Sequence, residues 1–106
     1  MKFNKTNKYE IYIGLKDQDT YEEIFDEKTF ASLLSDICKK KQICFSLVNQ
    51  LGGYTHNKGY VTETSLRITL IGIDESEVNI LSNKLKEIIN TDTVLITHEK
   101  CETMYV

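Results

Sequence analysis

The stretch that decides the fold is Leu51 to Ile73, LGGYTHNKGYVTETSLRITLIGI. Its second half alternates apolar and polar residues, and this period of two is typical of a strand with one buried face. Leu66, Ile68 and Leu70 then share the buried face. Residues 52–60 are rich in glycine and polar side chains, so they predict a long connection from a preceding strand. The stretch therefore predicts a β-hairpin with an adaptable loop.

Three other segments also have the properties of strands. The first runs from Tyr9 to Leu15, where four apolar residues alternate with Glu10, Tyr12 and Gly14. Residues 43–51 provide the first strand of the hairpin, and residues 93–98 provide the last strand of the chain.

Two amphipathic helices separate these strands. The first is predicted to begin after Asp26 as N-cap and to end at the lysines 39–41, which suit the negative end of the helix dipole. The second is predicted to begin after Asp74, with Glu77 as its capping-box partner. Their apolar stripes recur at helical spacing: Phe30, Leu33, Leu34 and Ile37 in the first helix, and Val78, Leu81, Leu85, Ile88 and Ile89 in the second.

The order β-α-β-β-α-β predicts an α+β fold of the ferredoxin-like type. Right-handed crossovers place both helices on one face of a four-stranded antiparallel sheet, with strands one and three in the centre. We expect residues 1–106 to form a single domain, with a flexible N-terminus over residues 1–7.

Composition excludes several classes of protein. The formal net charge is −3 and the lysines are scattered, so there is no basic face for nonspecific nucleic-acid binding. No apolar run is long enough for a membrane span or a signal peptide, which predicts no membrane partner and a cytoplasmic protein. The three cysteines match neither a CxxC site nor a secreted disulfide framework and are expected to be small buried residues.

The uncovered face of the sheet is the candidate site. The period of two puts Tyr12, Glu63, Ser65 and Arg67 there, and the glycine-rich loop adds Tyr54 and His56 at one end. Arg67, the single arginine of the chain, suits a phosphate or carboxylate, Glu63 can accept from a ribose hydroxyl or a base edge, and the tyrosines can stack on a flat ring. This combination predicts a nucleotide-like anionic ligand, although an ordinary solvated sheet face has the same composition.

The sequence contains no recognisable catalytic or metal-binding motif. Neither His56 nor His98 has a carboxylate or cysteine at metal-ligand spacing, and there is no Gly-x-Ser-x-Gly motif or Cys-His pairing. We therefore predict a protein that is not an enzyme, with no catalytic residue, metal or cofactor.

The segments YEIYIGLKD (residues 9–17), GYTHNKG (53–59) and ETSLRI (63–68) resemble a family of small uncharacterised proteins of phages and prophages of low-G+C bacteria. In topology the chain is also similar to PII-like proteins, and that similarity implies an oligomer that binds nucleotides between subunits. The nucleotide-contacting motifs of PII proteins are not found in this sequence, so their roles are not transferred.

By analogy, the chain resembles phage proteins that sequester nucleotide immune signals such as cyclic ADP-ribose isomers or cyclic dinucleotides. The first hypothesis is accordingly a non-catalytic homo-oligomer that binds a nucleotide-derived anion in the host cytoplasm. The alternatives are a phage protein that inhibits a host protein by direct binding, and a small dimeric α/β-barrel enzyme.

Overall fold

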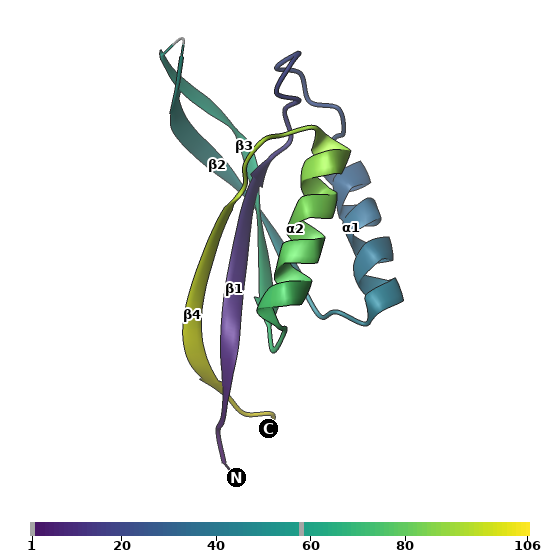
Figure 1. Cartoon of the computed structure of the whole chain (residues 1–106), viewed down its shortest axis with the longest axis vertical. Helices are drawn as coiled ribbons and strands as arrows, with labels where there is room; N and C mark the ends of the chain where they lie inside the picture. Colours follow the sequence, from purple (N-terminus) through teal and green to yellow (C-terminus); the bar gives the residue numbers. More distant parts are fainter. Residues whose placement is uncertain (1, 58) are drawn as a thin grey trace.

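The computed structural model describes residues 2–57 and 59–106, with His56 described by its backbone alone. The element order is β1 (Asn4–Gly14), α1 (Glu27–Lys41), β2 (Ser46–His56), β3 (Gly59–Ile71), α2 (Glu75–Ile89) and β4 (Leu95–Thr103). The strands form one antiparallel sheet in the order β2-β3-β1-β4, and both helices lie on the same side of it (Figure 1). These observations confirm the predicted ferredoxin-like α+β fold and its central strands.

The core lies between the helices and the sheet, on the face that alternation predicted. Ile11 on β1 pairs with Ile68 on β3, and both are fully buried. The other members of this core are Tyr9, Ile13, Leu15, Phe30, Leu34, Cys38, Leu66, Leu70, Val78, Leu81, Leu85 and Ile89. Burying so much apolar surface is the main driving force for the fold, at about 25 cal/mol for each Å² removed from water.

The two helices begin at the predicted residues but differ in their caps. The Asp26 side chain accepts a hydrogen bond from the backbone N–H of Thr29 at 2.7 Å, which satisfies one free donor at the start of α1. Asp74 precedes α2 without such a bond, so the predicted capping box is not formed there. Gln42 and Asn90 end the helices in the left-handed conformation, with φ of 56° and 60°.

The predicted loop over residues 52–60 is for the most part paired strand. β2 and β3 remain in register from Ser46 opposite Thr69 to His56 opposite Gly59. Since β1 ends opposite Ser65, the rest of this hairpin extends past the sheet as a two-stranded ribbon, seen at the top of Figure 1. The extended shape arises because glycines 52 and 53 adopt strand geometry instead of a turn.

At the opposite end, β1 begins at Asn4, earlier than the predicted Tyr9, because its first residues pair with the last residues of β4. Residues 4–7, which were expected to be flexible, lie within this strand. Cys38 is buried as predicted, but Cys44 is exposed because it lies in the segment before β2. Within residues 2–57 and 59–106, no helix is long and apolar enough to cross a membrane.

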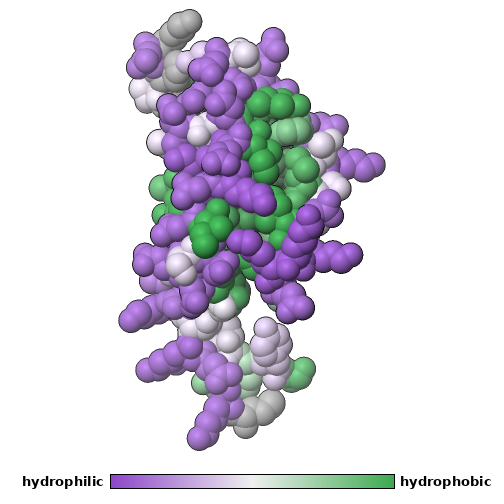
Figure 2. All heavy atoms as spheres, turned by 45° about the vertical axis from the view of Figure 1, so that its right-hand side comes forward, coloured by the Kyte–Doolittle hydropathy of each residue, from purple (hydrophilic) through white to green (hydrophobic). Residues whose placement is uncertain are grey.

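The surface around the helices is mainly hydrophilic. In Figure 2, charged and polar residues cover much of the face that is turned forward, and hydrophobic residues gather in its upper middle. Several apolar side chains, among them Phe25, Ile37 and Phe45, are partly buried against the core. Because both helices lie on one side of the sheet, its other face is uncovered and carries polar side chains.

Candidate functional site

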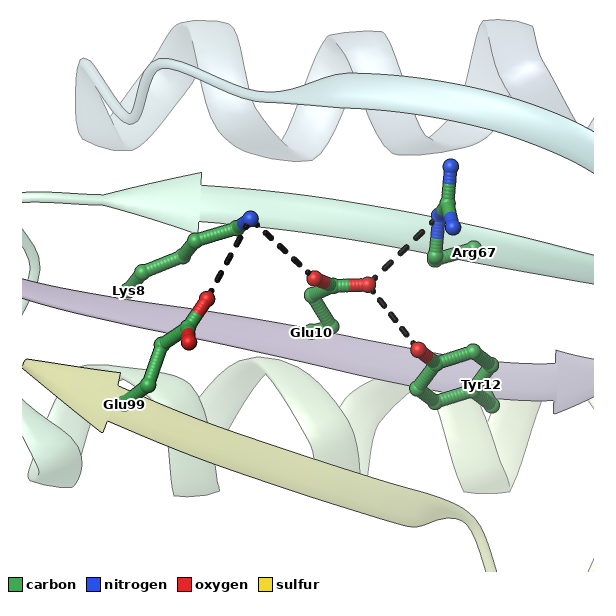
Figure 3. Close-up of polar contacts among 5 residues, drawn as sticks. All are labelled: Lys8, Glu10, Tyr12, Arg67 and Glu99. Atoms are coloured by element: carbon green, nitrogen blue, oxygen red, sulfur yellow. Dashed lines mark hydrogen bonds and ion pairs between the residues drawn. The ribbon is translucent and has the colours of Figure 1, made fainter. Parts of the chain in front are cut away.

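Charged side chains form a network along the uncovered face of the sheet (Figure 3). Glu10 is its centre: Oε2 accepts a hydrogen bond from the Tyr12 hydroxyl at 2.9 Å and lies 3.5 Å from Nε of Arg67. Lys8 Nζ lies 3.3 Å from the other Glu10 oxygen and 3.4 Å from Glu99. The network therefore joins β1, β3 and β4 across their solvent side.

The arginine that was predicted to bind a ligand belongs to this network through its ion pair with Glu10, although its buried Nε has no hydrogen-bond partner among the described residues. The hydrogen bond from Tyr12 is the largest influence that lowers the pKa of Glu10, and the nearby Lys8 and Arg67 charges add to it. The same contact with Glu10 raises the pKa of Lys8. Glu10 is thus held as a carboxylate that pairs with Arg67, although the alternation of β1 had identified it only as an outward-facing residue.

A cavity of about 580 Å³ lies beyond the network, where β1 ends and the β2–β3 ribbon begins. Its volume falls in the range of about 300 to 1,000 Å³ that small-molecule sites have. It is lined by Tyr12, Gly14, Lys16, Asp17, Gln18, Tyr21, Gln50, Gly52, Gly53, Tyr54, Glu63, Ser65, Thr91, Asp92, Thr93 and Leu95. The floor comes from strands, and one wall comes from the loops before α1 and after α2.

Small residues make the floor of this cavity. Gly52 lies against Ser65, and a Cβ added at Gly52 would be 3.0 Å from the Ser65 Cβ. A Cβ added at Gly14 would overlap the carboxylate of Glu63. Glycine at position 14 therefore allows the Glu63 carboxylate to lie across the end of β1, and a side chain at this position would displace that carboxylate.

Glu63 is the most unusual group in the cavity. Burial raises the pKa of its carboxyl, and the nearby Glu23 adds to the rise, whereas Lys16 and a hydrogen bond from Tyr54 oppose it. Its Oε2 atom is shielded from solvent and has no hydrogen-bond partner among the described residues. Burial is also the first cause that raises the pKa of Tyr54, followed by the charge of Glu63. Functional sites often contain a partly buried carboxylate that lacks a hydrogen-bond partner for one of its oxygens.

Four of the six predicted site residues line the cavity together: Tyr12, Tyr54, Glu63 and Ser65. Arg67 shares their face of the sheet, but it pairs with Glu10 and is not among the lining residues. The backbone of His56 lies at the end of β2, and its side chain falls outside the described residues. The predicted cluster is thus divided between the cavity and the network next to it.

Sequence reasoning missed the wall of the cavity. Lys16, Asp17, Gln18 and Tyr21 precede α1, while residues 91–93 follow α2. No role for Asp17 was predicted from the sequence, yet this residue is only 8% exposed. Its one local signal is an aspartate followed by polar residues, which is typical of a turn.

The charges of the cavity favour a cation over an anion. Among the described residues that line it, Lys16 is the single cationic side chain, whereas Asp17, Glu63 and Asp92 are carboxylates. The unpaired oxygen of Glu63 needs a hydrogen-bond donor or a positive charge. The cavity can therefore bind a small molecule with a positive centre, with tyrosines beside it that can contact a planar ring.

No protein-family model matches the sequence, and no curated protein is significantly similar to it. Several solved structures are similar in fold. A phage SAM lyase in complex with S-methyl-5'-thioadenosine has a TM-score of 0.70 at 22% identity, over 94% of this chain and 90% of that one. CPII from Thiomonas intermedia K12, a nitrogen regulatory PII-like protein bound to ADP, AMP and bicarbonate, has a TM-score of 0.60 at 12% identity, over 99% of each chain. The divalent ion tolerance protein CutA1 from Ehrlichia chaffeensis has a TM-score of 0.53 at 20% identity, over 93% of this chain and 82% of that one.

These likenesses support the fold that the chain shares with PII-like proteins and with a phage protein. They also correct one prediction. The expectation that the chain is not an enzyme is wrong, because a structure that it resembles over almost its whole length is that of a lyase. Of the hypotheses drawn from the sequence, the small enzyme is the one that the comparisons favour over the non-catalytic binder.

Proposed function

We propose that this protein is a lyase that binds S-adenosylmethionine or a closely related sulfonium nucleoside and cleaves it to S-methyl-5'-thioadenosine. The observation that carries the proposal is the carboxylate of Glu63, partly buried and with one oxygen unpaired, in a cavity whose carboxylates outnumber its single lysine. The likeness to a phage SAM lyase with S-methyl-5'-thioadenosine supports the same ligand class.

The ligand's charge distinguishes this proposal from one based on phosphates. S-adenosylmethionine carries a sulfonium and an ammonium, and both are attracted to a cavity rich in carboxylates. ADP and AMP, which CPII binds, carry phosphates that this cavity would repel. Under this proposal the chain shares the fold of CPII but binds a different ligand.

In the proposed reaction, the bond between the sulfonium sulfur and the γ-carbon of the aminobutyryl chain breaks, and both electrons stay on sulfur. The sulfur becomes the neutral thioether of S-methyl-5'-thioadenosine. The γ-carbon receives electrons either from the substrate's own carboxylate, which closes a lactone, or from the neighbouring C–H bond, whose proton passes to Glu63. Neither route consumes water or a cofactor. The two products are isomers, and proton NMR distinguishes them because only the second has vinyl protons.

The residues divide the work in this proposal. The Glu63 carboxylate holds the positive centre, and Tyr54 is hydrogen-bonded to that carboxylate and orients it. Ser65 and Tyr12 lie along the floor, where they contact the nucleoside. Arg67 does not contact the ligand in this proposal. It pairs with Glu10, and Glu10 accepts the hydrogen bond from the Tyr12 hydroxyl.

We also propose that the protein works as a homo-oligomer in the cytoplasm of the host. Leu51 and Tyr60 on the β2–β3 ribbon are 79% and 73% exposed. A second copy that packs on the ribbon would bury both of these apolar side chains. Native mass spectrometry tests the assembly, and a monomer at micromolar concentration would contradict it.

Calorimetry tests the ligand class without turnover. Sinefungin carries an ammonium in place of the sulfonium and lacks the bond that is broken, whereas S-adenosylhomocysteine has a neutral thioether at that position. We expect sinefungin to bind about tenfold more tightly than S-adenosylhomocysteine, a difference of roughly 1.4 kcal/mol, and ADP not to bind. Tighter binding of ADP than of sinefungin would overturn the proposal.

A further inference from the structure

The wall of the cavity is made by two loops that are far apart in the sequence. Lys16, Asp17, Gln18 and Tyr21 come from the loop between β1 and α1, and residues 91–93 come from the segment between α2 and β4. Neither loop belongs to the sheet that forms the floor. Their relative position is therefore set by contacts between them, and most of these contacts involve Asn90.

Asn90 ends α2 and is connected to the first loop through both its side chain and its backbone. Its Nδ2 donates to Asp17 Oδ2 at 2.8 Å and to Asp19 Oδ2 at 3.0 Å. Its backbone oxygen accepts from the Gln18 N–H at 2.9 Å. The first loop is also tied internally, because Asp17 Oδ1 accepts from the N–H groups of Asp19 at 2.7 Å and Thr20 at 3.0 Å.

These contacts fix the orientation of two side-chain amides. Only the NH₂ end of Asn90 can face two carboxylates, so its Oδ1 must point elsewhere. That Oδ1 accepts from Gln18 Nε2 at 3.4 Å. The Gln18 amide is consequently oriented too, with its Oε1 shielded and unpaired among the described residues. The donor end of Gln18 is therefore taken by Asn90, and this bond fixes the side chain in the cavity wall.

The Asp17 carboxylate is the charged anchor of this arrangement. The hydrogen bond from Asn90 is the largest cause that lowers its pKa, followed by the bonds from the backbone of Thr20 and Asp19. Asp17 is thus ionised at neutral pH and holds Asn90 as a charge-assisted acceptor. Asn90 itself is not among the residues that line the cavity.

We infer that Asn90 is a positioning residue, which holds the loop of residues 16–21 against residues 91–93 and so places Gln18 in the wall of the ligand cavity. The inference rests on the proposed function and deepens it, because it assigns the loop of residues 16–21 as the wall against which the nucleoside packs, while Glu63 takes the positive centre.

The chain offers a matched control for the helix cap. Asn90 and Gln42 both end a helix in the left-handed conformation, with φ of 60° and 56°, and each N–H bonds to carbonyls of its own helix. Glycine adopts this conformation without strain, so Asn90→Gly and Gln42→Gly both preserve a helix end. Only the first removes the side chain that contacts Asp17 and Gln18.

The experiment combines hydrogen exchange of the free protein with calorimetric titration of S-methyl-5'-thioadenosine into wild type and both variants. We expect Asn90→Gly to speed exchange in a peptide covering residues 16–22 and to weaken binding about 10- to 100-fold, the scale of a misplaced binding group. Gln42→Gly should match wild type in both measurements. In a turnover assay, Asn90→Gly should raise KM and leave kcat within about twofold, as loss of uniform binding does.

The possible failures are distinct. Exchange that is unchanged in Asn90→Gly, or binding within twofold of wild type despite faster exchange, would overturn the positioning role and leave the proposed function standing. Wild type that binds neither S-methyl-5'-thioadenosine nor sinefungin would overturn the proposed function, and this inference with it.

Discussion

Replacing Glu63 by glutamine should separate binding from stability. Burial raises the pKa of this carboxyl above its ordinary value of 4.5. Since the folded protein holds this proton more tightly than the unfolded chain does, the group's stabilising contribution is fully present below pH 4.5 and is lost as the pH rises through the folded pKa. At neutral pH the ionised carboxylate therefore lowers the stability of the fold, and Glu63→Gln should raise it.

The size of the effect follows from the unpaired Oε2 atom. A buried polar group without a partner costs about 1–3 kcal/mol. Because glutamine keeps a polar oxygen and loses the charge, we expect a gain at the lower end, about 1 kcal/mol, which corresponds to roughly 4 °C in melting temperature. A hydrogen bond to a charged group contributes about 1.5–3 kcal/mol, so the affinity for sinefungin should fall about 10- to 150-fold.

The assay is thermal unfolding between pH 4 and pH 8 together with calorimetry of sinefungin binding. The matched control is Glu99→Gln, which removes a carboxylate from β4 that pairs with Lys8 and does not line the cavity. The control should change neither the affinity nor the melting temperature appreciably, because exposed ion pairs contribute about 0–1 kcal/mol. A Glu63→Gln protein that binds sinefungin as wild type does, or that is less stable at pH 7, would refute the reasoning.

Three further predictions test the same cavity. Gly14→Ala places a Cβ on the Glu63 carboxylate, so the affinity for sinefungin, measured by calorimetry, should fall about tenfold or more. The control is Gly72→Ala, which does not affect a residue of the cavity lining. Because Gly72 has a positive φ, this control should lower the stability of the fold and leave the affinity unchanged. Sinefungin affinity should weaken as the pH falls through the raised pKa of Glu63, because protonation removes the charge that holds the cation; a pH-independent dissociation constant in wild type would contradict this. Arg67→Ala should change the affinity for sinefungin less than about threefold and the stability by about 1 kcal/mol or less, because Arg67 pairs with Glu10 outside the cavity. Calorimetry and thermal unfolding measure the two effects. A large loss of affinity would show instead that Arg67 contacts the ligand.

The faces of the central strands could be predicted because period two leaves one choice wherever a face is buried. Leu66, Ile68 and Leu70 are fully buried, and Arg67 lies between them on the other side. The partner of Arg67 could not be predicted in the same way. Glu10 and Glu63 are both on that face, and the register that brings Glu10 to the arginine depends on the packing of the whole sheet.

The glycines show why composition misled. Residues 52 and 53 predicted a turn, since glycine is common where φ is positive. In the structure they are strand residues, and Gly52 lies so close to Ser65 that a Cβ there would be 3.0 Å from the Ser65 Cβ. A glycine that allows a close approach within a sheet and one that permits a turn have the same appearance in a sequence.

The wall of the cavity was beyond prediction for a different reason. Asp17 and Asn90 are 73 positions apart and meet only because two crossovers return the chain to the same end of the sheet. Asparagine at the end of a helix is explained by its tolerance of positive φ, so nothing local indicated that its side chain also contacts an aspartate.

The most direct test of the central claim is product formation from S-adenosylmethionine, followed by liquid chromatography and mass spectrometry. Wild type should release S-methyl-5'-thioadenosine in many-fold molar excess over protein, and Glu63→Gln should slow this release about 10- to 150-fold while Glu99→Gln leaves it unchanged. Release that stays at the level of a protein-free control, with S-adenosylmethionine bound intact, would contradict the lyase assignment.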